Sequence, residues 1–347
     1  DLSRLVHAVV KHSGDQESIE VTINVPIKGR NDVAQVTYTR TYWPGDPQNG
    51  RKNGKIINLG NTGVTILPHV RFPEKVRPDY RITLALDNNM VERDMVSDLP
   101  TLAFLKDTTP IEFTHEGCRN LDSQRTRKDN STSVAKQWNL ESNFTAIIVA
   151  YKGTEGMIVP LMKDGGGSKK FYFAVDFGTT NTHIEYAIEN SGSRAFDTHT
   201  DDAQLRPVPS MMSDAEWTKM QSGELIPAII GEGRTNGNSI SFPIRTAITS
   251  PSNVDWTREV VPLVDANIPF FYERKLQPNY NEPPTTDLKW NSDEKTQART
   301  RCFLSELAML MRNKVLMNNG DLSATQLVWF YPTSMSLRQV GNFANIW

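Results

Sequence analysis

One ten-residue segment, Phe173–Thr182 (FAVDFGTTNT), combines a carboxylate, a glycine and hydroxyl groups in an order that suits phosphate binding. Asp176 comes at the end of an apolar run, where a single carboxylate can hold a hydrated Mg²⁺. Gly178 allows a tight reversal of the chain, so that backbone N–H groups can point inward at phosphate oxygens. The hydroxyl groups of Thr179 and Thr180 can donate further hydrogen bonds to these oxygens. The segment therefore predicts a β-hairpin whose turn binds phosphate and magnesium.

The same residues resemble the first phosphate motif of the superfamily that unites actin, the heat-shock chaperones and the sugar kinases. The chaperone version reads aliphatic residue, Asp, hydrophobic residue, Gly, Thr, Thr, Asn, and Ser or Thr, and Val175–Thr182 follows this order. The resemblance implies ATP and Mg²⁺ as cofactors, with Asp176 in a catalytic position where it coordinates the metal through water. It also implies a phosphate loop made of Gly178, Thr179, Thr180 and Asn181. The alternative is an ordinary hairpin whose turn reads Gly-Thr-Thr-Asn.

Elements further along the chain resemble the same superfamily in their order. We expect a helix over Ser292–Asn318 from its apolar stripe, then a strand covered on both faces at Leu327–Tyr331 (LVWFY), then a helix that begins near Ser336. In the chaperones a catalytic lysine lies beyond a proline that follows the hairpin, and Lys275 lies about as far beyond Pro243. The resemblance therefore implies a catalytic role for Lys275, and the alternative is a solvated surface lysine.

Before the hairpin, the chain reads mostly as β-structure. The spacing of the apolar residues in Leu2–Val9 predicts a short opening helix, and alternating apolar residues then predict strands such as Ile19–Val25 and Tyr80–Leu86. The glycine-rich residues 164–170 (DGGGSKK) have the composition of an interdomain linker. They imitate the second phosphate loop of the superfamily only superficially, because they precede the first motif.

We therefore predict an α+β protein in three parts. Residues 1–163 form a β-rich, sandwich-like domain, residues 164–170 form the linker, and residues 171–347 form the first lobe of an actin-like α/β (ribonuclease H-like) ATPase fold. The superfamily carries a second phosphate loop and an adenosine-binding glycine pair on its second lobe, and neither pattern follows the hairpin here. The chain also starts at Asp1 without Met and stops inside an expected helix. We expect a piece of a larger protein that binds ATP weakly and is inactive by itself.

Composition limits the partners and the location of the protein. Lys and Arg number 38 against 40 Asp and Glu, so the net charge of −2 gives no field that would attract nucleic acid or an anionic membrane. No apolar stretch is long enough to span a bilayer, and no signal-peptide pattern opens the sequence. The two cysteines, Cys118 and Cys302, lack metal-ligand spacing, which favours a reducing, cytoplasmic setting. We expect a nucleotide ligand and a protein partner on the β-rich domain.

Three classes of function remain open on these residues. The first is a chaperone-like ATPase whose nucleotide state is coupled to the attached β-rich domain. The second is a kinase that moves phosphate to a small molecule, for which the sequence shows no recognisable catalytic carboxylate or sugar-contacting residue. The third is a catalytically inactive interaction or filament protein that retains the fold. The Thr-Thr-Asn-Thr turn at residues 179–182 favours the first class.

Overall fold

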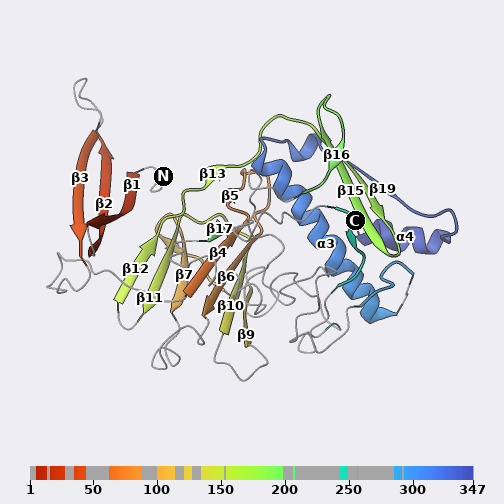
Figure 1. The fold of residues 1–347 in the computed structure, drawn as a ribbon, viewed down its shortest axis with the longest axis horizontal. Helices are drawn as coiled ribbons and strands as arrows, with labels where there is room; N and C mark the ends of the chain where they lie inside the picture. Colours follow the sequence, from red (N-terminus) through yellow and green to blue (C-terminus); the bar gives the residue numbers. More distant parts are fainter. Residues whose placement is uncertain are drawn as a thin grey trace. The chain divides into compact units, whose positions relative to one another are not determined.

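The computed structural model divides the chain into two compact units, whose elements are labelled in Figure 1. The structure describes residues 5–13, 16–27, 35–43, 62–86, 100–113, 121–126, 134–151, 154–197, 206–207, 242–248, 256, 285–290 and 293–346. Unit 1 comprises Asp1–Gly60, Asp94–Glu112 and Asn143–Met162. Unit 2 comprises Asn61–Arg93, Phe113–Ser142 and Lys163–Trp347. Part of the β-rich region is thus grouped with the C-terminal half, and the domain boundary at residue 163 stays a prediction.

Unit 1 contains two antiparallel sheets. The first has the order β1-β2-β3, with the bounds Val6–Ser13, Gln16–Pro26 and Gln35–Tyr42. The second has the order β12-β11-β7-β8, with the bounds Thr154–Ile158, Ala146–Tyr151, Thr101–Lys106 and Thr109–Pro110. The buried rings of Phe104 and Phe144 meet edge to face beside the second sheet, with their centroids 5.8 Å apart.

The opening helix predicted for Leu2–Val9 is wrong from Val6 onward, because Val6 begins strand β1, and residues 2–4 of the prediction lie outside the described residues. All eight residues of β1 pair antiparallel with β2 in an unbroken register. An ion pair of 2.7 Å between Lys11 on β1 and Glu20 on β2 supports this register. Strand formation depends mainly on contacts with the neighbouring strand. Here these contacts stabilise a strand more than the helical spacing of a few apolar residues stabilises a helix.

Unit 2 contains an antiparallel sheet of the order β17-β4-β6-β10-β9. Its strands have the bounds Arg206–Pro207, Thr62–Leu67, Tyr80–Leu86, Val134–Leu140 and Leu121–Thr126. Ile66, Ile82 and Leu140 are buried in it. Two short strands of the same unit, β5 (Val70–Arg71) and β13 (Lys163–Asp164), pair in parallel. The sheets of both units confirm the β-rich character predicted for residues 1–163, and their packing as a sandwich stays a prediction.

A mixed sheet in unit 2 contains the predicted hairpin. β14 (Phe171–Phe177) and β15 (Asn181–Ile188) pair antiparallel, and β19 (Gln326–Phe330) pairs in parallel with β14. The short strands β16 (Arg194–Ala195) and β18 (Ile244–Arg245) pair with β15. The predicted hairpin and the strand predicted at Leu327–Tyr331 are therefore confirmed, and the structure shows that they share one sheet.

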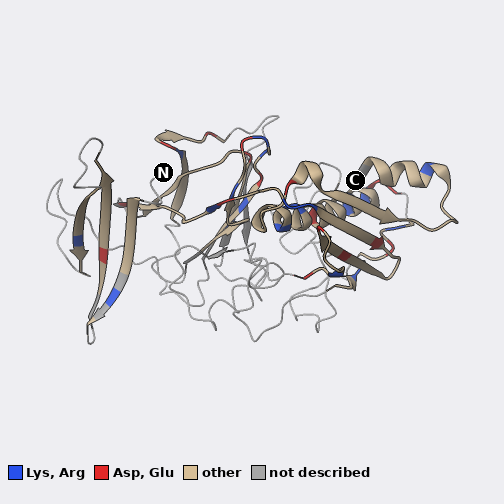
Figure 2. Ribbon diagram, turned by 90° about the horizontal axis from the view of Figure 1, so that it is seen from above, with Lys and Arg blue, Asp and Glu red and all other residues tan. Residues whose placement is uncertain are grey.

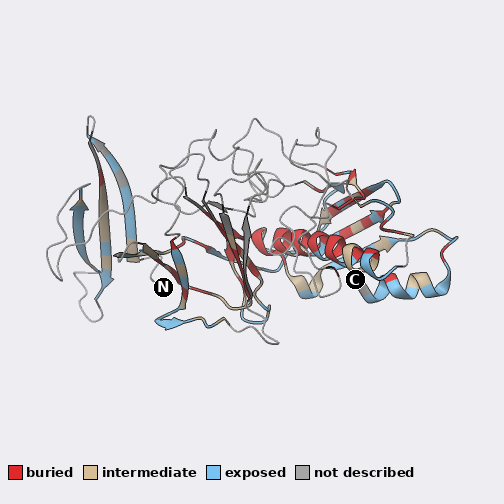
Figure 3. Ribbon diagram, turned by 90° about the horizontal axis from the view of Figure 1, so that it is seen from below, coloured by how far each residue is buried: buried red, intermediate tan, exposed pale blue. Residues whose placement is uncertain are grey.

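Helix α3 (Glu294–Met317) packs against this mixed sheet. The carboxylate of Asp293 caps the helix by accepting the N–H of Thr296 at 3.0 Å. Apolar α3 side chains such as Phe303 and Leu307 join Phe173 and Phe177 of β14 in one hydrophobic cluster. Figure 3 shows that the helix is buried along most of its length. Along β14, buried and exposed residues alternate, so the sheet is covered on one face.

Both predicted C-terminal helices are confirmed. The second, α4 (Leu337–Ile346), follows a capping box in which the N–H of Ser336 donates to Gln339 Oε1 at 2.9 Å. In return, the N–H of Gln339 donates to Ser336 Oγ at 3.3 Å. A short 3₁₀ turn, η5 (Leu322–Ala324), connects α3 to β19.

The prediction that Leu327–Tyr331 is covered on both faces is wrong. The side chains of Val328 and Phe330 are each 55% exposed. Among the described strands β19 forms the edge of its sheet, and Trp329 is the residue of this strand that packs against the hydrophobic cluster. A short apolar run therefore predicts the strand correctly, but it does not predict how many faces of the strand are covered.

The glycine-rich residues 164–170 pack against the C-terminal end of α3. The N–H of Gly166, which has a left-handed φ of 81°, donates to the carbonyl of Leu316 at 2.8 Å. A Cβ at Gly167 would lie 2.4 Å from the carbonyl oxygen of Asn319. These glycines permit close approach between backbones. Their role as a linker between domains stays a prediction.

Charge is mixed along the described part of the chain. Figure 2 shows Lys and Arg interspersed with Asp and Glu in the sheets and helices. Among the described residues, no helix combines the length and the apolar character needed to cross a membrane.

Candidate phosphate-binding site

The turn between β14 and β15 brings the predicted binding residues together. These are Asp176, Gly178, Thr179, Thr180 and Asn181. The N–H of Gly178 donates to the carbonyl of Asn181 at 3.1 Å, and this bond closes the turn. A Cβ at Gly178 would lie 2.3 Å from the same carbonyl oxygen, so the turn requires glycine. Asp176, Thr179 and Thr180 are exposed beside it, where a ligand can reach their oxygen atoms.

Strand β18 supports the turn from the side of β15. Asn181 pairs opposite Arg245, and the N–H of Thr246 donates to the carbonyl of Thr180 at 2.8 Å. The buried hydroxyl groups of Thr182 and Thr246 share a hydrogen bond of 2.7 Å. The backbone at residues 180–182 is therefore tied to a second strand, which limits its freedom before any ligand binds.

Lys289 places a cation beside the turn. Its ammonium group donates to the carbonyl of Phe177, and the residue is 8% exposed. Burial lowers the pKa of Lys289, and the charge of Asp176 acts in the opposite direction by favouring the protonated form. The carboxylate and the ammonium group therefore lie near each other at the end of β14.

Trp290 contacts the turn next to this lysine. Its indole Nε1 donates to Thr179 Oγ1 at 2.8 Å, and its ring packs against the hydrophobic cluster. Leu288, two residues before Trp290, is buried. Its carbonyl accepts a hydrogen bond from the hydroxyl group of Thr300 on α3 at 2.8 Å. The long helix thus holds the segment that touches the turn.

Sequence reasoning missed Lys289 and Trp290, which lie more than 100 residues beyond the hairpin. A signal was present, because a cation between the apolar Leu288 and Trp290 stands just before the helix cap Asp293. When its apolar neighbours pack into the core, a lysine between them is brought close to the core as well. The other predicted catalytic residue, Lys275, lies outside the described residues.

Asp176 is a single carboxylate. Within the described ranges no group of three or more His, Cys, Asp and Glu side chains could hold a metal ion. Mg²⁺ usually keeps several waters and takes one or two carboxylates together with phosphate oxygens. An exposed Asp176 would fit that requirement if a ligand at the turn supplied phosphate oxygens, whereas a dedicated all-protein metal centre would need more ligands.

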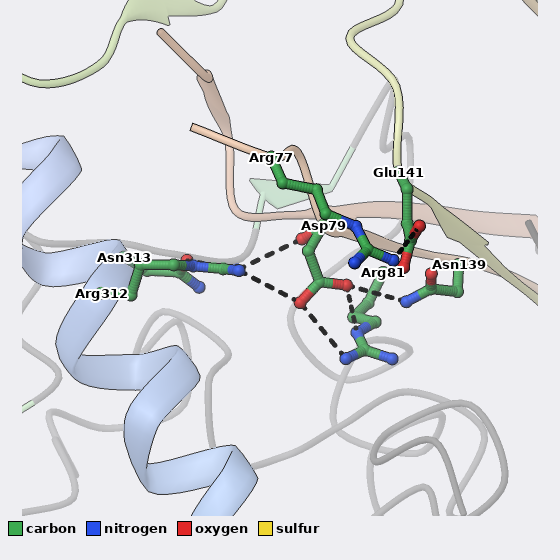
Figure 4. A network of polar contacts seen from close by, with 7 residues as sticks. All are labelled: Arg77, Asp79, Arg81, Asn139, Glu141, Arg312 and Asn313. Carbon is green, nitrogen blue, oxygen red and sulfur yellow. Dashed lines mark hydrogen bonds and ion pairs between the residues drawn. The ribbon is translucent and has the colours of Figure 1, made fainter. Parts of the chain in front are cut away.

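A second polar cluster of unit 2 surrounds Asp79 (Figure 4). Its carboxylate accepts hydrogen bonds from Asn139 on β10 at 2.8 Å and from Arg312 on α3 at 3.3 Å, and Arg81 on β6 lies 3.3 Å away. Burial alone would raise the pKa of Asp79, but the two arginines and these hydrogen bonds outweigh it and lower the pKa. The cluster ties α3 to the β6 sheet, so we assign it a structural role.

Glu306 lies close to that cluster, but its carboxyl group differs from that of Asp79 in its hydrogen bonding and in its pKa. It is fully buried within α3, and in the described part of the chain neither of its carboxylate oxygens has a hydrogen-bond partner. Burial raises the pKa of Glu306 to about 8, although Arg81 and Arg312 act in the opposite direction. At neutral pH the side chain is therefore mainly a neutral acid.

Comparison of this chain with protein-family models, with curated proteins and with solved structures finds no match. The site therefore has to be interpreted from its own geometry.

Proposed function

We propose that the chain binds the phosphates of Mg·ATP at the turn between β14 and β15, as part of a chaperone-like ATPase. The observation that carries this proposal is the closed turn at Gly178, with exposed Asp176 on one side and the ammonium group of Lys289 beside it. A bound Mg²⁺ would neutralise phosphate charge and would be held by Asp176 through water. The order of hairpin, long helix, parallel strand and helix supports the finer proposal that residues 171–347 form the first lobe of an actin-like fold.

Each residue has a defined task in this proposal. The turn from Gly178 to Asn181 offers backbone N–H groups and hydroxyl groups to phosphate oxygens. Lys289 supplies positive charge from a nearly buried position, where electrostatic interactions are stronger than in water. Because Lys289 already donates to the Phe177 carbonyl, its ammonium group is held in place before the ligand arrives. We assign it the role that the sequence had suggested for Lys275.

The first test is a titration with ATP, with and without Mg²⁺, followed by phosphorus NMR. We expect weak, Mg²⁺-dependent binding with a dissociation constant of about 1 mM and no tighter, or roughly −4 kcal/mol. Association costs at least roughly 4 kcal/mol in lost translational and rotational freedom, and this cost leaves only weak net binding for hydrogen bonds in an open, solvated turn. Hydrolysis of ATP by this chain should be too slow to measure.

Asp176→Asn should retain the fold and lose the Mg²⁺ dependence of binding, because the amide keeps the shape of the side chain without its charge. Lys289→Met should weaken the binding of ATP with or without Mg²⁺. Glu185→Gln is the matched control, because Glu185 is an exposed carboxylate on the neighbouring strand β15 outside the turn. An Asp176→Asn variant with unchanged Mg²⁺ dependence would remove Asp176 from the site. No binding by the wild-type chain at about 10 mM Mg·ATP, well above the expected constant, would favour an inactive interaction protein instead.

A further inference from the structure

We propose that Trp290 is a positioning residue, which orients the hydroxyl group of Thr179 so that its proton points towards a bound phosphate. The inference rests on the proposed function, because it assigns the ligand at Thr179 to the class of phosphoryl groups. It adds a residue outside the motif at residues 173–182, contributed by the segment just before α3.

The direction of the hydrogen bond carries the argument. An indole N–H is a donor only, so the 2.8 Å contact between Trp290 Nε1 and Thr179 Oγ1 fixes the threonine oxygen as the acceptor. The one proton of the hydroxyl group must then point elsewhere. Thr179 is exposed, so that this proton is available to a ligand. Phosphate oxygens at neutral pH are mainly acceptors, and a donor aimed at them is complementary.

The position of Trp290 is fixed by contacts on both sides. Its ring packs against the hydrophobic cluster of unit 2, and the ammonium group of Lys289 lies 5.9 Å from the ring centroid. Leu288, two residues earlier, is buried and accepts the Thr300 hydroxyl on α3. A donor held in this way excludes the rotation in which the Thr179 proton would point at the indole, so fewer rotations remain to be ordered on binding than for a free hydroxyl group.

Two substitutions at Trp290 distinguish the effect of its N–H donor on binding from the effect of its aromatic ring. Trp290→Phe keeps an aromatic ring and removes the N–H group. Trp290→His restores a donor, because its Nε2 is joined to Cβ through the same number of ring atoms as the indole Nε1. At pH 8 an imidazole with an ordinary pKa near 6.5 is mostly neutral, so added charge does not attract phosphate. Trp329→Phe is the control, since Trp329 also packs against the cluster but lies on β19.

The experiment measures the dissociation constant of Mg·ATP by phosphorus NMR at pH 8 for the wild-type chain and these variants. Loss of one hydrogen bond should weaken binding about three- to tenfold in Trp290→Phe, and Trp290→His should recover most of it. Thr179→Val should weaken binding at least as much, and the double variant with Trp290→Phe should be no weaker than Thr179→Val alone. Trp329→Phe should match the wild type.

Failure of the inference and failure of the proposed function give different results. If the wild-type chain shows no Mg²⁺-dependent binding, the proposed function is wrong and the inference falls with it. If the wild type binds but Trp290→Phe and Thr179→Val bind equally well, only the positioning role is overturned. Weakening in Trp290→Phe without recovery in Trp290→His would assign the effect to packing and would also overturn it. Should Trp290→Phe fail to fold, unchanged binding by Thr179→Val, whose side chain is exposed, would still overturn the positioning role.

A second measurement does not depend on nucleotide. In the free protein, the nitrogen–proton NMR signal of the Trp290 indole should move in Thr179→Val, because the hydrogen bond from Nε1 is lost. The signal of the Trp329 indole should stay in place. An unmoved Trp290 signal would show that the two side chains do not interact in solution, and it would overturn the positioning role whatever the affinity for Mg·ATP.

Discussion

A guanidinium nitrogen of Arg312 on α3 lies 3.3 Å from a carboxylate oxygen of Asp79, although the two residues are 233 positions apart in the sequence. Arg81 shares the same carboxylate from strand β6. One partly buried anion thus holds two cations, one from the helix and one from the sheet. Removing the anion would leave both cations without their shared partner.

Asp79→Asn should therefore destabilise unit 2 strongly. Breaking a buried ion pair by removing one partner typically costs about 3–5 kcal/mol, because the remaining charge is left uncompensated. We expect a clear fall in the urea midpoint of the transition that reports on α3. Asp164→Asn is the matched control, because Asp164 is an exposed partner in the ion pair with Arg71 and should change the midpoint little. Equal midpoints for Asp79→Asn and the wild type would contradict a stabilising role for the cluster.

Glu306 should make the free energy of unfolding depend on pH. Its folded-state pKa of about 8 lies above the ordinary value of 4.5. Between these two values the unfolded chain releases a proton that the folded chain retains, so stability falls as pH rises from about 4.5 to about 8. At about 1.4 kcal/mol per pH unit, the difference between the two pKa values sets an upper limit of roughly 5 kcal/mol.

Glu306→Gln should remove this dependence. The variant should match the wild type near pH 5 and become progressively more stable than the wild type towards pH 8. Urea unfolding at several pH values measures the difference. The same substitution at Glu294, which is exposed at the start of α3, should leave the slope of the wild type unchanged. A constant difference between Glu306→Gln and the wild type over this range would show that Glu306 does not retain its proton in the folded state.

Gly167→Ala should destabilise the protein by about 1–3 kcal/mol, because the added Cβ would meet the backbone of Asn319 at 2.4 Å and the backbone cannot rotate away. Gly192→Ala makes the same chemical change in open space, with nothing within 4 Å of the new Cβ. That substitution should be neutral or slightly stabilising, because it reduces the freedom of the unfolded chain. Thermal unfolding of the two variants gives the comparison, and equal effects would mean that residues 164–170 are not packed as described.

The hairpin could be predicted because its information is local. Phe171–Phe177 is an apolar run interrupted only by Asp176, Gly178 marks the turn, and the returning strand follows directly. The long helix could be predicted for the same reason, since its apolar stripe repeats at helical spacing. Glu306 also left a visible signal, as an acidic residue between Phe303 and Leu307 in that stripe. Its burial follows from the neighbours that surround it on the helix.

Other features depend on distant parts of the chain. The residues next to Val6 in the sequence are compatible with the start of a helix or of a strand. Pairing with β2 decides in favour of the strand. Val328 and Phe330 are exposed because, among the described residues, no second layer covers their side of β19. A five-residue apolar run does not contain the information on whether such a layer is present. Lys289 and Trp290 reach the turn only after a long stretch without recognisable periodicity, and no spacing rule connects them to Thr179.

The exposed strand β19 bears directly on how these experiments are run. Edge strands with apolar side chains are templates for pairing between molecules, and Val328 and Phe330 are more than half exposed. Weak ligands require concentrated protein, which is also the condition that promotes such association. Light scattering recorded alongside each titration would separate a binding signal from clustering of the chains, and a charged replacement such as Val328→Lys would give a better-behaved background in which to compare the variants at the turn.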